Sequence, residues 1–319
     1  MLFRSGVAAG LKSYALVAGA MPSDQAPAAA DCCLENAYVK VTVRDGLLDV
    51  LDKPTGVVYE GLNLLEEEAD AGDAWDFSEP LTPGQVFRNS DFPSTSRLIE
   101  SGPVRATIRI ETRMRVPARL VGNRRSRQKK DLLVTTDVSV LAGSRRVDVA
   151  IEIDNQAKDH RIRLACRTPI RTDQVASQGH FGIIRRPVVC PHNPEGWLQV
   201  PHTYHFRDVV SLADGRTGLA LACRGLYEYE PAASETGTDL KVTLLRGIDR
   251  MSRWKTKARG NRNGSPSYAI PEAQCLGLHR FEYTVVPFDG NLGAGCIDTV
   301  NAFLYPPICH LVRDEQRAE

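Results

Sequence analysis

The sequence has almost no excess of charge, no long apolar run and no phosphate-binding motif, and each absence excludes a class of function. Its 319 residues contain 40 Lys and Arg against 39 Asp and Glu, so no overall field attracts nucleic acid or an anionic membrane. Charged or turn residues interrupt every apolar run before about 18 residues, the length that a transmembrane helix needs. We therefore expect neither nucleic acid nor a membrane as a partner.

Motifs for metal and nucleophilic chemistry are also missing. No glycine-rich phosphate loop, nucleophile elbow or His-Glu-x-x-His motif occurs. His202 and His205 are close in sequence, but a strand would place them on opposite faces, and no Cys, Asp or Glu joins them within residues 201–206. The eight cysteines form no Cys-x-x-Cys pair. We expect free thiols, no metal and a cytoplasmic location.

The first residues resemble a secretory signal only in part. Arg4 precedes small and apolar residues, but Lys12 leaves an uninterrupted apolar stretch of only Tyr14 to Ala20. A strand is the better interpretation of this segment. We expect a leading strand and an Ala- and Pro-rich linker within residues 1–31, with the linker at 21–31, then a main domain at 32–310 and a polar tail at 311–319.

Strict alternation of apolar and polar residues is the dominant pattern, whereas helical periodicity is nearly absent. Residues 104–116 and 147–153 each place apolar side chains on one face and charged ones on the other, which is typical of half-buried antiparallel strands. Further strands are expected at residues 38–43, 132–141, 161–166, 218–223, 241–245 and 281–286. Turn sequences such as Arg44-Asp45-Gly46 separate these runs. The sequence thus predicts an all-β protein built as a large antiparallel β-sandwich.

A basic segment at residues 119–130 lies between two predicted strands. Its cations include Arg124, Arg125, Arg127, Lys129 and Lys130. No aromatic residues are interleaved with them, and the net charge of the chain is near zero, so the features of a nucleic-acid site are missing. We expect a solvated hairpin tip.

Two acidic segments are candidates for carbohydrate chemistry. One runs from Glu66 to Asp76 and the other holds Glu228 and Glu230; both are expected as loops, where acidic side chains are usually just solvated. The first differs in its make-up, because its carboxylates alternate with aromatic residues in Asp73-Ala74-Trp75-Asp76-Phe77. We expect Asp73 and Asp76 to bind sugar hydroxyl groups and Trp75 to cover the C–H face of the ring.

A series of blocks in this chain resembles the C-terminal β-region of bacterial-type family 38 α-mannosidases, in the same order and spacing. The blocks include Leu34 to Val41, Leu51-Asp52-Lys53-Pro54-Thr55-Gly56, Gly72 to Pro80, His160 to Leu164, Arg185-Arg186-Pro187, Phe206 to Val209, Gly225 to Glu230, Leu244-Leu245-Arg246, Met251-Ser252-Arg253 and Pro271 to Cys275. The likeness runs from about residue 34 to 286, and Ala8 to Tyr14 is similar to the strand that leads into this region.

The resemblance implies a supersandwich of antiparallel sheets, of the galactose-mutarotase-like kind. It also implies that the zinc ligands and the aspartate nucleophile lie in an N-terminal catalytic domain that this sequence does not contain. No residue of this chain is therefore assigned as nucleophile, general acid or zinc ligand. As an isolated chain we expect it to be inactive, with an α-mannoside and a catalytic α-mannosidase domain as its partners.

The same resemblance implies which side chains approach the sugar. Trp75 matches an aromatic position that faces the active site, where tyrosine is more usual, so the hydrogen bond of a tyrosine hydroxyl is lost here. An arginine from residues 251–260 is also expected to approach the site, and Arg253 or Arg259 matches it. In that block Lys255-Thr256-Lys257 replaces the acidic residues that the family pattern leads us to expect.

Three other functions stay open on the sequence alone. A free-standing carbohydrate-binding module would bind mannose oligomers saturably. A structural fragment would expose a large apolar surface built for a missing catalytic domain. Full glycosidase activity would need the carboxylates of residues 70–76 and those of Glu228 and Glu230 to converge within about 10 Å.

Overall fold

The computed structural model describes residues 26–82, 84–190, 202–257 and 266–308, most of which form antiparallel β-sheet. The largest sheet has the order β16-β15-β18-β19-β22-β13-β12-β9-β8, with strands β8 (Ser94–Ser101), β9 (Arg105–Pro117), β12 (Lys129–Leu141), β13 (Val147–Asn155), β15 (Gln174–Gln178), β16 (Ile183–Pro187), β18 (Val209–Ala213), β19 (Thr217–Arg224) and β22 (Gly277–Asp289). The second has the order β17-β20-β21-β14-β6-β7, with β6 (Leu64–Ala69), β7 (Phe87–Arg88), β14 (His160–Cys166), β17 (Tyr204–His205), β20 (Glu228–Ala233) and β21 (Thr238–Gly247).

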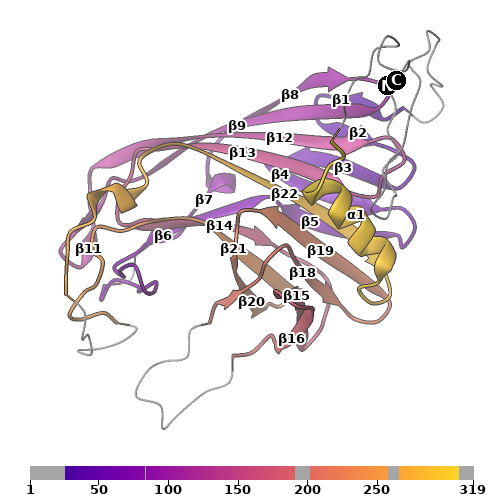
Figure 1. Cartoon of the computed structure of the whole chain (residues 1–319). Helices are drawn as coiled ribbons and strands as arrows, with labels where there is room; N and C mark the ends of the chain where they lie inside the picture. Colours follow the sequence, from indigo (N-terminus) through magenta and orange to yellow (C-terminus); the bar gives the residue numbers. More distant parts are fainter. Residues whose placement is uncertain (1–25, 83, 191–201, 258–265, 309–319) are drawn as a thin grey trace, which may run out of the picture.

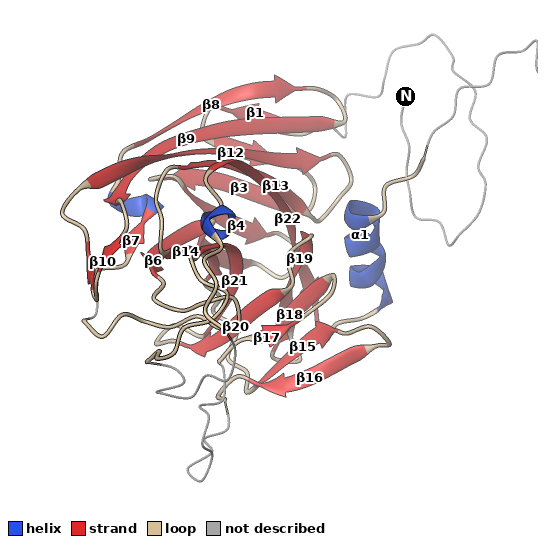
Figure 2. Ribbon diagram, turned by 60° about the vertical axis from the view of Figure 1, so that its left-hand side comes forward, coloured by secondary structure: helices blue, strands red, loops and turns tan. Residues whose placement is uncertain are grey.

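Two smaller sheets accompany these two large ones in the described residues. One contains β1 (Ala28–Ala30), β2 (Cys33–Glu35), β3 (Val39–Arg44), β4 (Leu47–Asp52) and β5 (Val57–Leu62), in that order, and the other is the hairpin of β10 (Leu120–Val121) and β11 (Arg124–Arg125). In both views β8, β9 and β12 of the nine-stranded sheet lie above the six-stranded sheet, whereas the other end of the same sheet, β18, β15 and β16, lies near the bottom (Figures 1 and 2). The architecture is the all-β antiparallel sandwich that the sequence predicts.

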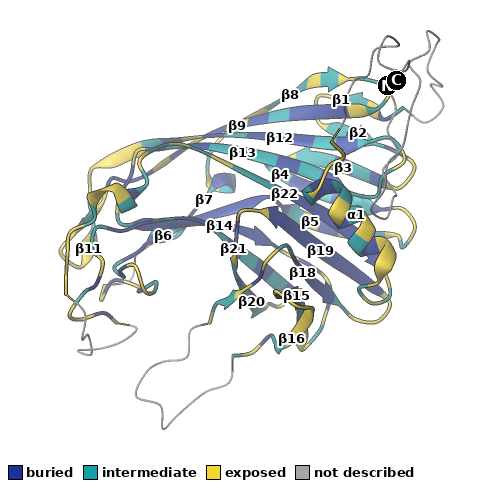
Figure 3. Cartoon of the chain, in the orientation of Figure 1, coloured by how far each residue is buried: buried dark blue, intermediate teal, exposed yellow. Residues whose placement is uncertain are grey.

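Alternation along the long strands places one face of each in the core. In β9 the buried residues include Ala106, Ile108, Ile110, Met114 and Val116, while arginines project from the opposite face. Burial of such a face removes about 25 cal/mol of unfavourable hydration for each Å² of apolar surface. Strand β13 repeats the pattern, and Figure 3 shows buried and less buried residues alternating along these strands.

Buried tyrosines add polar contacts inside the sandwich. The hydroxyl of Tyr59, from β5, donates to the carbonyl oxygen of Gly218 at 3.0 Å. The hydroxyl of Tyr283, from β22, donates to the side-chain oxygen of Asn63 at 3.0 Å. A buried hydroxyl needs a partner, so these bonds fix how the nine-stranded sheet faces β5 and the start of β6.

One helix, which alternation does not predict, covers part of the nine-stranded sheet. Helix α1 (Ala294–Leu304) buries Cys296, Val300 and Phe303 against apolar side chains of β18, β19 and β22. The spacing of these residues, four and then three positions apart, is typical of a helix. Three apolar residues over two turns are too few to indicate a helix in a sequence that is otherwise rich in strands. Within the described ranges no helix is long and apolar enough to cross a membrane.

The N-terminal prediction is corrected in part. The expected leading strand lies outside the described residues. The expected linker at 21–31 is wrong at its end, because Ala28–Ala30 forms strand β1 and pairs with β2. The side chain of Asp31 also accepts a hydrogen bond from the backbone of Leu98 at 2.9 Å. Small alanines suit an edge strand as well as a connection, so composition alone did not separate the two.

Candidate functional site

A loop that follows β6, residues 70–79, is shaped by two buried aspartates. The Oδ1 atom of Asp70 accepts hydrogen bonds from the backbone N–H of Gly72 at 2.8 Å and of Ser78 at 3.3 Å. The Oδ1 atom of Asp73 accepts from the backbone N–H of Trp75 at 3.0 Å. Both carboxylates are shielded from solvent. The loop therefore has its shape because its acidic side chains bind its own backbone.

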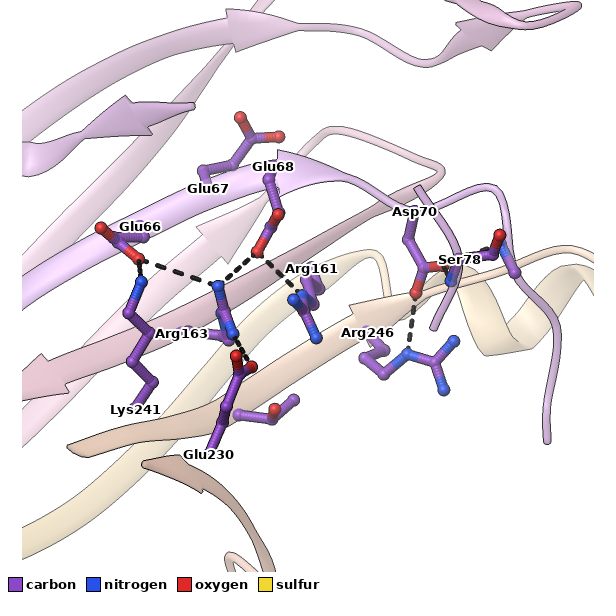
Figure 4. A network of polar contacts seen from close by, with 12 residues as sticks. Glu66, Glu67, Glu68, Asp70, Ser78, Arg161, Arg163, Glu230, Lys241 and Arg246 are labelled. Carbon is purple, nitrogen blue, oxygen red and sulfur yellow. Dashed lines mark hydrogen bonds and ion pairs between the residues drawn. The ribbon is translucent and has the colours of Figure 1, made fainter. Parts of the chain in front are cut away.

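A second loop, residues 249–257, is joined to the first, and we call the two segments the paired loops. The backbone N–H of Arg253 donates to Oδ2 of Asp73 at 2.7 Å, and its Nε donates to the carbonyl oxygen of Gly72 at 2.8 Å. At the end of β21, Nε of Arg246 donates to Oδ2 of Asp70 at 2.8 Å (Figure 4). Charge-assisted bonds of this kind are short and directional, so the two loops behave as one unit.

Glycine at position 72 is required by this close contact. A Cβ atom there would lie 2.1 Å from the carbonyl oxygen of Asp76 and 2.8 Å from the backbone nitrogen of Ser78. Both are backbone atoms, which cannot move aside without opening the loop. Local packing thus explains the glycine of this block.

Each of the paired loops presents a tryptophan to solvent. Trp75 is 63% exposed and Trp254 is 71% exposed. They belong to neighbouring backbone segments, because Ala74 donates its N–H to the carbonyl oxygen of Arg250, and Arg253 binds Asp73. Exposed indoles held on a rigid backbone are suited to stacking on a ligand at a low entropic cost.

The structure brings together most of the residues predicted to bind sugar. Trp75 is exposed, Asp76 is half-buried, and Arg253 is half-buried between the paired loops. Arg259 lies outside the described residues. The expectation for Asp73 is not met, because its carboxylate is fully buried and binds backbone N–H groups instead of facing solvent. Trp254 was missed by the sequence reasoning, although it directly follows the Met251-Ser252-Arg253 block.

The acidic residues at the start of the first segment form a charged ladder, not a solvated loop. Glu66, Glu67 and Glu68 lie on strand β6. Glu68 binds Arg161 and Arg163 of β14, each at 2.9 Å, and Glu66 binds Lys241 of β21 at 2.7 Å. Figure 4 shows these side chains on neighbouring strands of the six-stranded sheet.

The second acidic segment is also a strand and joins the same ladder. Glu230, on β20, binds Arg163, and Glu228 accepts a hydrogen bond from the hydroxyl of Thr243 at 2.6 Å. Carboxylates of both acidic segments therefore converge on one guanidinium. A glycosidase needs one carboxyl with a raised pKa as general acid. Burial raises the pKa of Glu66, but Lys241, Arg163 and Arg88 outweigh burial and hold that pKa below its ordinary value. Glu66, Glu68 and Glu230 of the ladder are thus held in ion pairs.

The basic hairpin is only partly a solvated tip. Its strands β10 and β11 form the expected hairpin, and Arg124 is exposed. Arg125 instead reaches into the protein and binds the fully buried carboxylate of Glu67, with one contact at 2.8 Å. His160 contacts the same carboxylate at 3.0 Å. Composition alone could not single out Arg125, among the cations of this segment, as the one that binds a buried carboxylate.

Acid should destabilise the chain because of this ladder. Burial raises the pKa of Glu67, but His160 and Arg125 outweigh it, so the pKa of this carboxyl, like that of Glu66, lies below the ordinary value of 4.5. A lowered folded-state pKa stabilises the fold above the unfolded pKa, and this contribution is lost as pH falls through the folded value. We expect the urea midpoint to be level above about pH 5 and to fall steadily below 4.5.

A matched variant makes that measurement specific. Glu66→Gln and Glu67→Gln should each lower the midpoint at neutral pH and flatten its decline in acid. If the parent chain keeps its neutral midpoint down to about pH 3, the two carboxylates do not support the fold in this way.

A polar groove of about 470 Å³ lies beside the paired loops. Its lining comes from the paired loops, from Asp159 and from the turn of the β10–β11 hairpin, Gly122 and Asn123. Acidic and basic side chains both contribute to it, which suits a ligand that carries many hydroxyl groups. Among the described residues no group of three or more His, Cys, Asp or Glu could hold a metal ion.

Comparison with known proteins identifies the family to which this fold belongs. The model of the glycosyl hydrolases family 38 C-terminal domain matches residues 34–250. The chain belongs to this family. A protein of Halalkalibacterium halodurans named "Putative mannosylglycerate hydrolase" is 28% identical over 277 residues, which cover 81% of this chain and 29% of that protein.

Solved structures of the family agree with the sheet arrangement. An α-mannosidase from Enterococcus faecalis V583 superposes with a TM-score of 0.71 at 23% identity, over 85% of this chain and 30% of that one. A family 38 glycosyl hydrolase from Enterococcus faecalis gives 0.67 at 25% identity, over 85% and 31%. The family 38 chain described here thus spans about a third of the length of the relatives that it matches.

Proposed function

We propose that this chain serves as the C-terminal β-domain of an α-mannosidase-type glycoside hydrolase and helps to shape its sugar pocket. The observation that carries the proposal is the family match over residues 34–250, together with the exposed Trp75 on a loop that buried aspartates hold rigid. In this proposal the catalytic carboxylates and zinc belong to another part of the enzyme, which is the partner of this domain. The β-domain contributes binding and orientation, which are large terms in catalysis.

The chemistry of the paired loops supports a role in binding sugars. A pyranose ring has apolar C–H faces and a rim of hydroxyl groups, so it is bound by an aromatic surface beside polar groups. Trp75 and Trp254 supply the aromatic surface, and the neighbouring groove supplies the polar groups. α-Mannosides are the substrate class that we infer from the names of the relatives.

Hydrolysis assays test the proposal directly. We expect the purified 319-residue chain to leave p-nitrophenyl α-mannoside intact with or without added zinc, because its paired carboxylates are held in ion pairs and cannot supply a general acid. The Glu230→Gln variant is the control. A zinc-dependent rate that Glu230→Gln abolishes would overturn the proposal, whereas a rate that the variant leaves unchanged comes from a contaminant.

A free-standing carbohydrate-binding module is the second candidate, and the two exposed tryptophans favour it. The two functions differ in how affinity depends on ligand length. A binding module gains affinity with each added mannose unit because several subsites act together. A domain that completes a pocket binds a single mannosyl glycoside, and its affinity rises little when further mannose units are added.

We place the protein in the cytoplasm as part of the same proposal. The cysteines of the described ranges are all free thiols, and Cys166 and Cys223 are buried in the core. Disulfides are rare in reducing compartments. Fractionation of the host cell, with immunodetection of the chain, measures this directly.

A further inference from the structure

His160, the first residue of β14, is buried between two side chains that accept hydrogen bonds. Its Nδ1 atom lies 3.0 Å from Oε1 of Glu67, and its Nε2 atom lies 3.1 Å from Oδ1 of Asn155. All three side chains are shielded from solvent, so their polar atoms need partners within the protein. A neutral imidazole has one donor and one acceptor nitrogen, whereas an imidazolium donates from both. The partners of the ring therefore decide its charge.

Asn155 offers the ring its oxygen and not its amino group. Its Nδ2 atom donates to the carbonyl oxygens of Gln274 at 3.3 Å and Cys275 at 2.7 Å, and its Oδ1 atom accepts from the backbone N–H of Ala157 at 3.0 Å. Turning the amide over would set its amino group against an N–H and its oxygen against two carbonyl oxygens. Nε2 of His160 must therefore carry a proton.

Glu67 is also an acceptor only. The two terminal nitrogens of Arg125 donate to its two carboxylate oxygens, and the contact with Oε2 measures 2.8 Å. A guanidinium keeps its charge in proteins, and this forked contact is the one that an ionised carboxylate makes. Nδ1 of His160 must therefore donate as well, which makes the ring an imidazolium.

The charges around His160 balance when the ring is positive. Its neighbours come from five elements: Glu67 of β6, Arg125 of β11, Asn155 of β13, Gly247 of β21 and Gln274 of the 3-10 helix η2 (Pro271–Gln274). Of these, Glu67 and Arg125 are charged. The half-buried carboxylate of Asp159, the residue before His160, belongs to the same cluster. Two anions thus match two cations, which lowers the cost of a buried imidazolium.

One side of this cluster holds the β10–β11 hairpin. Arg125 of β11 lies opposite Leu120 of β10. The backbone N–H of Leu120 donates to Oδ2 of Asp159 at 3.1 Å. The hairpin is therefore bound to both anions of the cluster, to Glu67 through β11 and to Asp159 through β10. Leu120 and Asp159 also line the groove, so this side of the cluster fixes one of its walls.

The other side of the cluster holds η2. Nε2 of Gln274 donates to Oδ1 of Asp159 at 2.7 Å, and its Oε1 atom accepts from the backbone N–H of Asp159 at 2.9 Å. The carbonyl oxygen of Gln274 accepts from Asn155, whose own oxygen faces His160. The polar contacts thus form a closed circuit, and His160 is the point at which its two sides meet.

We propose that His160 is a buried imidazolium and that its bonds to Glu67 and Asn155 form a proton-dependent clasp, which holds the β10–β11 hairpin and η2 on the six-stranded sheet. A ring with one proton fewer leaves a nitrogen lone pair against one of the two acceptors, whichever tautomer it adopts. Such a contact is repulsive, and the buried acceptor loses its donor. The clasp is therefore closed while the ring has both protons and opens when alkali removes one. It is independent of the proposed function, because no sugar takes part.

Nitrogen NMR of the full chain, labelled with nitrogen-15 at histidine, tests the charge of the ring. At about pH 7.5, where an ordinary imidazole is mostly neutral, we expect two ring N–H groups for His160. Its signals are those that His160→Gln removes. If this variant does not fold, replacing the other histidines one at a time identifies the signals by elimination. A single ring N–H for His160 at this pH overturns the proposal.

Hydrogen exchange at the amide of Leu120 tests the clasp. His160→Gln cannot carry the positive charge, so we expect the protection of this amide to fall about tenfold. The amide of Gly61, which donates to Asp49 in another sheet at 2.9 Å, should keep its protection. His205→Gln, at an exposed position on β17, is the matched control and should leave both amides unchanged. Equal protection of Leu120 in His160→Gln and the parent chain would show that the ring does not hold the hairpin.

Discussion

Replacing Glu67 with alanine is expected to lower the free energy of unfolding by about 3–5 kcal/mol. The carboxylate of Glu67 is fully buried between Arg125 and His160. The second ring nitrogen of His160 faces the side-chain oxygen of Asn155 at 3.1 Å. Alanine would leave the guanidinium of Arg125 buried without its counter-charge, and an uncompensated buried charge costs much more than a lost surface pair. Urea denaturation of parent and variant measures the difference.

An exposed pair in the same chain is the control. Glu100 binds Arg105 at 2.7 Å, but both side chains are well exposed to solvent. Because water and salt screen such a pair, Glu100→Ala should cost about 0–1 kcal/mol. If Glu67→Ala costs no more than Glu100→Ala, then Arg125 finds solvent once its partner is removed, and the buried network is not what holds the hairpin.

This network also connects the fold to the groove beside the paired loops. Arg125 belongs to β11, and the turn that precedes it, Gly122 and Asn123, lines the groove. The contact of Arg125 with Glu67 therefore anchors one wall of the groove to the six-stranded sheet. A surface hairpin without such an anchor would sample many positions, and a groove bounded by it would be poorly preorganised for a ligand.

Strands β9, β12 and β13 of the nine-stranded sheet could be predicted from sequence because one face of each is apolar. Residues 104–116 and 147–153 alternate strictly, and they correspond to β9 and β13. The turn at Asp45 and Gly46 was also predictable, because an Asp-Gly pair is typical of a tight hairpin, whose central residues need positive φ angles. In the structure these angles are 50° and 77°.

The strand at residues 64–69 could not be recognised in the same way. Strand β6 carries three successive glutamates, and all three are matched by cations from elsewhere in the chain. A polar run in a sequence indicates a loop unless its distant partners are known. Glu66 and Lys241, for example, are 175 residues apart. The pairing of the two loops was hidden for the same reason, because Asp70 and Arg246 are 176 residues apart.

Arg246→Ala is expected to cost about 3 kcal/mol of stability and to release the loop that carries Trp75. Nε of Arg246 binds Oδ2 of Asp70 at 2.8 Å, and one of its terminal nitrogens donates to the carbonyl oxygen of Asp73 at 3.0 Å. Without this side chain the buried carboxylate of Asp70 keeps only its bonds to the loop backbone. Urea denaturation reports the global effect, and hydrogen exchange at the amide of Trp75, which donates to Asp73, reports the local one.

Arg250→Ala and Arg246→Lys show whether geometry or charge holds the loop. Arg250 is on the same segment but well exposed, and it contacts Asp249 only at 3.9 Å, so its removal should change stability by less than about 1 kcal/mol. Lysine at position 246 keeps the charge but cannot reach two acceptors with a planar fork. We therefore expect Arg246→Lys to retain part of the stability, while hydrogen exchange at the amide of Trp75 stays as fast as in Arg246→Ala.

Slow hydrogen exchange at Trp75 in Arg246→Ala would contradict the prediction. It would mean that Arg253 alone fixes the loop, through its bonds to Asp73 and Gly72.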